Sequence, residues 1–150
     1  MNFPSNLTWH GTTTSGDEEH VRAASASIGT KHPIALSPGD GPQADATRWN
    51  PEDLLATSLG YCHMLTFLAL ARKVRIDVRG YDGLATAELT TVDKRTSVTT
   101  ITLTPTITLA PGGDVEKARA MFEKAGKYCF IGNSLTSEVR YAPTFVVAEA

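Results

Sequence analysis

The sequence predicts one α+β domain whose elements follow the order β-β-β-α-β-β-α-β. Three observations predict this class: an uncharged apolar segment at 54–71, alternation of Val, Ile and Leu with Thr at 98–109, and an amphipathic helical segment at 114–128. Because the strands come in runs and do not alternate regularly with helices, we expect α+β rather than α/β. A chain of 150 residues is about one domain long, so we expect a single domain over 1–150.

The first third of the chain is predicted to form short strands and loops. Residues 7–10 are β-prone, and after a polar turn residues 20–28 alternate loosely, so the two segments could pair as a hairpin. A third short strand is expected at 32–37. Residues 38–47 contain Pro-Gly-Asp-Gly-Pro and little apolar material, which predicts a loop.

A long helix is predicted to begin at Asn50-Pro51. Asn50 can cap it, Pro51 suits the first turn, and the carboxylates of Glu52 and Asp53 oppose the positive end of the helix dipole. Residues 54–71 carry no charge, and two basic residues follow where a helix C-terminus favours cations. The length alone would permit a membrane span. Polar residues spread along the segment favour instead the buried central helix of a domain.

The second half of the chain is predicted to contain strands around one further helix. Residues 74–92 form one or two strands, with a bulge or turn at 80–83, and a turn at 93–96 leads into the strand at 98–109. In the helix at 114–128, Asp114 is the expected N-cap. Its expected buried face consists of Ala118, Met121, Phe122 and Ala125. A last strand is expected at 136–147.

Composition and motifs exclude several functional classes. The net charge of −2 gives no basic surplus for nucleic acid. Two cysteines are too few for a disulfide scaffold, and no signal peptide begins the sequence, so we expect a reducing cytoplasm and no membrane. No metal-ligand spacing, G-x-S-x-G elbow or glycine-rich phosphate loop occurs, so we expect no metal and no cofactor.

The two cysteines are the candidate reactive groups. Cys62 lies inside the long helix beside His63, and Cys129 ends the second helix. Both could simply pack as small buried hydrophobes. A helix C-terminus disfavours an anion at Cys129, whereas a thiolate at Cys62 needs a nearby cation. Arg48, four residues before Glu52, is the candidate for that cation. Alternatively, Arg48 and Glu52 form only a solvated ion pair, which contributes under about 1 kcal/mol to stability.

The segment Asn50–Cys62 resembles the N-P-E-x-L-x-x-x-x-x-x-x-C signature of the OsmC/Ohr family. Cys129-Phe130-Ile131-Gly132-Asn133-Ser134 resembles the second cysteine motif of that family. The order of the elements and the chain length also match. The resemblance implies a thiol-dependent peroxidase that reduces organic hydroperoxides and is recycled by an external dithiol. It also implies an intertwined homodimer with active sites at the subunit interface.

The resemblance assigns roles residue by residue. Cys62 matches the reactive cysteine, Cys129 the resolving cysteine and Glu52 the acidic partner. Arg48 resembles the arginine that the OsmC branch carries before the helix, and Arg22 is a weaker rival. The chain lacks the Gly-Gly-Arg stretch of the Ohr branch, and Phe130 replaces the usual Pro, so it is closer to an OsmC-like branch with poorly defined substrates.

Helix geometry constrains how this site could be assembled. Glu52 and Cys62 are ten helical residues apart, a rise of about 15 Å. Either the Arg48 loop folds back over the helix, or a partner subunit supplies the pair. Apolar neighbours, if they line the site rather than the core, would favour an alkyl hydroperoxide. These substrate-binding candidates are Trp49, Tyr61, Met64, Phe67 and Phe130.

Two other functions remain compatible with the sequence. One is a member of the same fold that binds a small apolar or thiol ligand without peroxidase turnover, which Phe130 in place of Pro favours. The other is a structural dimer in which both cysteines are buried and inert.

Overall fold

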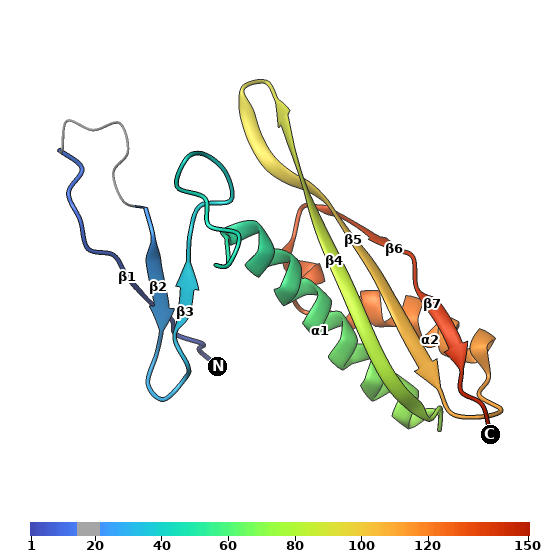
Figure 1. Cartoon of the computed structure of the whole chain (residues 1–150). Helices are drawn as coiled ribbons and strands as arrows, with labels where there is room; N and C mark the ends of the chain where they lie inside the picture. The colour runs from blue at the N-terminus through green and yellow to red at the C-terminus, as the bar shows by residue number, and fades with distance from the viewer. Residues whose placement is uncertain (15–21) are drawn as a thin grey trace. The chain divides into compact units, whose positions relative to one another are not determined.

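The first of two compact units, residues 1–54, contains a three-stranded antiparallel sheet. The computed structural model describes residues 1–14 and 22–150 (Figure 1). The second compact unit comprises residues 55–150. The strands are β1 (Asn6–Thr8), β2 (Ala24–Ser27) and β3 (Ile34–Leu36), with β2 in the centre. The three predicted strands are therefore confirmed, although each is shorter than expected. The start of the second predicted strand, at 20–21, lies outside the described residues.

The long helix α1 (Pro51–Lys73) begins and ends as its residues predict. Asn50 Oδ1 accepts a hydrogen bond from the Asp53 N–H at 2.7 Å, and Asp53 Oδ2 accepts one from the Asn50 N–H at 3.3 Å. This reciprocal cap satisfies two backbone donors at the helix start. Arg72 and Lys73 occupy the last turn, where their charge suits the negative end of the dipole.

The strands β4 (Val78–Val92) and β5 (Arg95–Leu109) form a long antiparallel hairpin (Figure 1). A two-residue turn joins them, in which Asp93 and Lys94 both have positive φ, at 50° and 64°. This geometry suits the right-handed twist of the two strands. Gly80 lies beside a bulge in a continuous β4, so the sequence reading of a bulge, rather than a turn, is confirmed.

The predicted last strand is divided into β6 (Glu138–Tyr141) and β7 (Thr144–Val147), both parallel to β5. The expectation of one strand over 136–147 was therefore wrong. Leu103 pairs with Tyr141 and Thr106 with Thr144, so the interruption falls opposite Pro105 of β5. Pro105 has no N–H to donate, and Pro143 lies in the interruption itself, so the ladder cannot run through this point.

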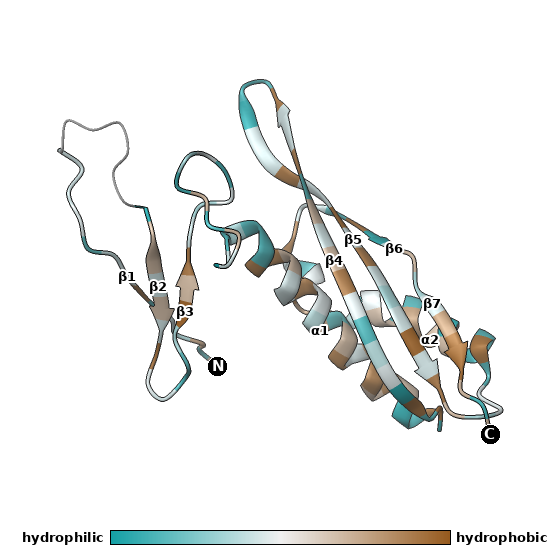
Figure 2. Ribbon diagram, viewed as in Figure 1, coloured by the Kyte–Doolittle hydropathy of each residue, from teal (hydrophilic) through white to brown (hydrophobic). Residues whose placement is uncertain are grey.

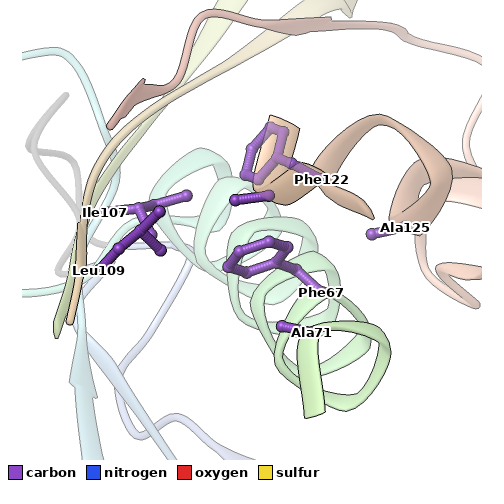
Figure 3. Packing of buried hydrophobic residues seen from close by; sticks show 7 residues of the cluster. Phe67, Ala71, Ile107, Leu109, Phe122 and Ala125 are labelled. Carbon is purple, nitrogen blue, oxygen red and sulfur yellow. The ribbon is translucent and has the colours of Figure 1, made fainter. Parts of the chain in front are cut away.

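The helix α2 (Val115–Tyr128) packs beside α1 on the sheet of the second unit (Figure 1). Asp114 Oδ1 accepts the Lys117 N–H at 2.9 Å, which confirms the predicted N-cap. Figure 3 shows Phe67 and Ala71 of α1 facing Phe122 and Ala125 of α2, with Ile107 and Leu109 of β5 beside them. A second cluster of buried side chains joins α1 to β5 and Cys129. It consists of Ala56, Leu59, Ile101, Leu103 and Cys129.

Both clusters bury only one stripe of α1. The buried members of the helix are Ala56, Leu59, His63, Phe67 and Ala71. Tyr61 and Leu65 remain 59% and 48% exposed, and the mixed colouring of α1 in Figure 2 shows no single apolar face. By length and composition alone α1 could cross a membrane, but a core helix passes the same test. The helix contributes to both core clusters, although only 28% of its most apolar 18-residue window is buried in this chain.

Candidate functional site

The two thiols are brought together although 66 residues separate them in the chain. Cys62 lies in the middle of α1, half-buried, and packs against the cluster that contains Cys129. Cys129 is the residue that ends α2, and it is 1% exposed. Both are free thiols in this structure. The sequence placed each cysteine on its helix correctly, and the fold adds their proximity.

The environment of Cys129 disfavours its thiolate. Burial raises the pKa of Cys129, and the neighbouring Cys62 thiol raises it further. The Gly132 N–H donates to Cys129 Sγ at 3.3 Å and opposes this shift, as does the backbone of Ile131. Because burial is the largest cause, Cys129 is held as a protonated thiol at neutral pH. A protonated thiol is a weak nucleophile, since the thiolate is the reactive form of cysteine.

His63, next to Cys62 in sequence, points into the core. Its ring centroid lies 4.4 Å from that of Phe122 and 5.0 Å from that of Tyr141. Among the described residues neither ring nitrogen has a hydrogen-bond partner. Burial lowers the pKa of His63 to about 4, and the nearby Phe122 backbone opposes this shift. His63 is therefore neutral at pH 7 and cannot serve as a cation beside Cys62.

Tyr141 is a neighbour of the thiol pair that the sequence did not indicate. Burial raises its pKa, and the charge that Cys129 would carry as a thiolate raises it further. A Cβ added to Gly126 of α2 would lie 2.7 Å from the Tyr141 hydroxyl oxygen, so the ring crosses the helix at this glycine. No local pattern could have found this contact, because it joins β6 to α2 through the tertiary fold.

Arg48 and Glu52 both lie in the first unit, Arg48 in the loop before α1 and Glu52 in the first turn of α1. Arg48 forms an ion pair with Asp45, in which Arg48 Nε lies 3.2 Å from a carboxylate oxygen of Asp45. The expected pairing of Arg48 with Glu52 is therefore not what the structure shows. The Asp45 carboxylate is positioned by Thr47, whose N–H and hydroxyl donate to Oδ1, and these bonds lower its pKa.

Two further contacts organise the loop before α1. A Cβ on Gly39 would lie 3.2 Å from a Glu52 carboxylate oxygen, so Glu52 rests against this loop. The guanidinium of Arg22 donates to the Asp40 carbonyl at 3.2 Å. Both candidate arginines are thus attached to the segment 40–48.

The five substrate-binding candidates have different surroundings. Phe67 is fully buried in the core, where its ring lies 5.6 Å from that of Phe122, so it has no surface to offer a ligand. Met64 is half-buried. The other three are exposed: Trp49 by 46%, Tyr61 by 59% and Phe130 by 82%.

Comparison with known proteins defines the class. The family described as OsmC-like protein matches residues 42–142, so this chain belongs to the OsmC-like family. This confirms the resemblance and the fold class that the sequence predicted. No curated protein matches the sequence.

Solved structures agree over nearly the whole chain. An OsmC-like protein of unknown function from Vibrio cholerae is 27% identical, with a TM-score of 0.83, and the match covers 95% of this chain and 99% of the other. An organic hydroperoxide resistance protein from Elizabethkingia anophelis is 16% identical, with a TM-score of 0.69 and 99% coverage of both chains. One from Bacillus subtilis is 18% identical, with a TM-score of 0.59 and coverage of 96% and 98%. At these identities the last two show a shared fold.

Proposed function

We propose that this chain is a thiol-dependent peroxidase that reduces organic hydroperoxides, with Cys62 as the attacking and Cys129 as the resolving cysteine. The observation that carries the proposal is the proximity of a half-buried thiol on α1 to a buried thiol at the end of α2. Structural neighbours named as organic hydroperoxide resistance proteins support the class of substrate. We expect one functional domain over 1–150, acting in the cytoplasm.

The proposed reaction has three steps. The Cys62 thiolate attacks the terminal peroxide oxygen, the O–O bond breaks, and the products are a Cys62 sulfenic acid and an alcohol after protonation of the leaving alkoxide. The Cys129 sulfur then attacks the sulfenic sulfur, and water leaves as the disulfide forms. An external dithiol reduces this disulfide by exchange and is itself oxidised to a disulfide.

Titration of thiols tests the proposal directly. We expect the native protein to lose two titratable thiols per chain after one equivalent of cumene hydroperoxide, with no oxygen retained in the intact mass. Thiols that stay fully titratable would exclude peroxidase turnover. That result would favour the second candidate, a ligand-binding protein of the same fold, for which the exposed Phe130 beside Cys129 is the supporting observation.

The first unit gives a structural reason to expect a homodimer. Among its described residues Ser37 alone is buried, so the sheet β1–β3 contributes no buried apolar side chain. Small sheets of this kind need a covering surface for stability. We predict an obligate homodimer burying more than about 2,000 Å² in total. Sedimentation of the pure protein at micromolar concentration should give twice the chain mass, and a stable monomer would contradict the prediction.

The role of Arg48 leads to a second prediction for this site. In the proposed dimer the partner subunit supplies Arg48 and Glu52 to Cys62. Removing the guanidinium in Arg48→Ala should then destabilise the thiolate and lower the rate of alkylation by iodoacetamide at pH 7 about tenfold. The pH profile should move to higher pH, and Arg22→Ala should change it much less. An unchanged profile in Arg48→Ala would show that this arginine does not act on Cys62.

A further inference from the structure

The turn that follows α1 contains an arginine at the position where this kind of turn usually has glycine. The Ile76 N–H donates to the Ala71 carbonyl at 2.9 Å, and the Arg75 N–H donates to the Arg72 carbonyl at 3.1 Å. These two hydrogen bonds define a Schellman motif, which requires a left-handed backbone at the position of Arg75. Arg75 has this conformation, with φ of 61°, and any residue with a Cβ is strained there whereas glycine is not. The fold therefore keeps an arginine where glycine would be more stable.

The side chains of this turn line a pocket with a volume of about 380 Å³, within the range of small-molecule sites. Arg72 and Arg75 contribute their guanidinium groups to it. Leu68, Ile76 and Val78 form part of its apolar wall. The pocket thus places two cations beside an apolar surface.

The two guanidinium groups of this pocket have no anionic partner in the described part of the chain. Within residues 1–14 and 22–150, neither the Arg72 nor the Arg75 side chain forms a hydrogen bond or an ion pair. Asp77 supplies a carboxylate to the lining, but it is paired with Arg79, whose Nη2 lies 2.7 Å from Asp77 Oδ2. The charge left around the pocket is therefore positive, although the whole chain carries −2.

The helix dipole does not account for all the cations at this turn. The C-terminal end of a helix carries the equivalent of about half a negative charge. Arg72 and Lys73 in the last turn of α1 are sufficient to oppose it. Arg75 lies beyond that turn, and Lys117 reaches the turn from α2, where its ammonium group donates to the Val74 carbonyl at 2.9 Å. The remaining positive charge favours a bound anion.

We propose that this pocket binds a phosphate monoester with a small apolar group, its phosphate held by Arg72 and Arg75 and its apolar part against Leu68. A guanidinium group can donate two parallel N–H bonds to phosphate oxygens, which favours arginine over lysine at such a site. Arg72 lies ten residues beyond Cys62, a rise of about 15 Å along α1. The site is separate from the thiols and does not rest on the peroxidase proposal, because it concerns binding alone.

Calorimetric titration of the purified protein at low salt with three probes tests the proposal. Phenyl phosphate should bind at one site per chain, inorganic phosphate at least threefold more weakly, and the cation benzylamine not measurably. The double variant Arg72→Gln/Arg75→Gln should lose about twentyfold in affinity for phenyl phosphate. The matched control Lys94→Gln/Arg95→Gln removes the same charge and also alters one residue with positive φ. It lies at the turn between β4 and β5, so its affinity should stay within twofold of the unaltered protein.

Arg75→Gly separates ligand binding from folding. Glycine adopts a φ of 61° without strain, so the midpoint of thermal unfolding should rise by about 2–4 °C. The same change removes one guanidinium group, so the affinity for phenyl phosphate should fall about fivefold.

Four outcomes would each overturn the proposal. They are no binding of phenyl phosphate by the unaltered protein, as expected if a carboxylate of a second copy occupies the arginines, inorganic phosphate binding as tightly as phenyl phosphate, equal losses of affinity in the two double variants, and full affinity in Arg75→Gly. A lower midpoint of thermal unfolding in Arg75→Gly would also contradict it, because Arg75 would then contribute to the stability of the fold.

Discussion

Cys62→Ser is expected to abolish peroxide consumption, even with abundant dithiol, because the nucleophile is removed while the buried Cys129 remains protonated. Burial and the neighbouring thiol both raise the pKa of Cys129, so it cannot replace Cys62 at neutral pH. We expect a loss of more than about a thousandfold, comparable to removal of the nucleophile in other covalent mechanisms. Consumption of cumene hydroperoxide in the presence of dithiothreitol measures the effect.

Cys129→Ser is the matched variant, because it retains the attacking sulfur and removes the resolving one. It should consume about one equivalent of peroxide and then stall with an oxygen adduct on Cys62, or proceed to the sulfinic acid under excess oxidant. Some turnover would remain if a small thiol reaches the sulfenic acid. Intact-mass spectra distinguish these species. An oxygen adduct on Cys129 in the Cys62→Ser protein, with activity retained, would reverse the assignment of the two cysteines.

The stability of the fold is expected to fall sharply as the pH drops from 6.5 towards 4, because of His63. Its pKa is lowered from 6.5 to about 4 by burial, so in this interval the unfolded chain binds a proton that the folded chain does not. The free energy of unfolding therefore decreases with falling pH, by on the order of 3 kcal/mol in total. Its neighbours Tyr141 and Cys129 have raised pKa values and do not titrate in this interval.

Urea unfolding at pH 7 and pH 4.5 measures this effect when the protein is compared with two variants. His63→Leu replaces the imidazole between Phe122 and Tyr141 with an apolar side chain that cannot be protonated. The free energy of unfolding of this variant should lose most of its pH dependence. His32→Leu removes an exposed histidine and should retain it. If all three proteins lose the same stability between these pH values, carboxylates rather than His63 cause the acid sensitivity.

The sequence predicted the elements whose signals are local. The cap at Asn50 and the cap at Asp114 are each formed within one turn, so the starts of both helices could be read from neighbouring residues. The alternation at 98–109 likewise marked β5. The division between β6 and β7 was missed because its cause, Pro105, lies on a different strand from the residues that it separates.

Less of the candidate site could be predicted from local sequence signals. Motif resemblance singled out both cysteines, and the fold brings them together through packing of α1 against the end of α2. The four-residue spacing of Arg48 and Glu52 predicts an ion pair between them. Arg48 precedes the helix, however, and a turn in which its N–H donates to the Asp45 carbonyl brings it to the Asp45 carboxylate instead. Phe67 was a plausible ligand contact by proximity in sequence, yet it lies on the buried stripe of α1.

The contact of Tyr141 with Gly126 means that substitutions at these two positions are not independent. A glycine inside a helix costs about 0.5–1 kcal/mol relative to alanine, so substitution at 126 would ordinarily be favoured. Here an added methyl group would meet the Tyr141 hydroxyl at 2.7 Å, and the rigid ring cannot bend away as a flexible chain would. A side chain at 126 thus requires a smaller residue at 141. Among descendants of this chain, the two positions are expected to change together, and Gly126 should persist wherever the tyrosine does.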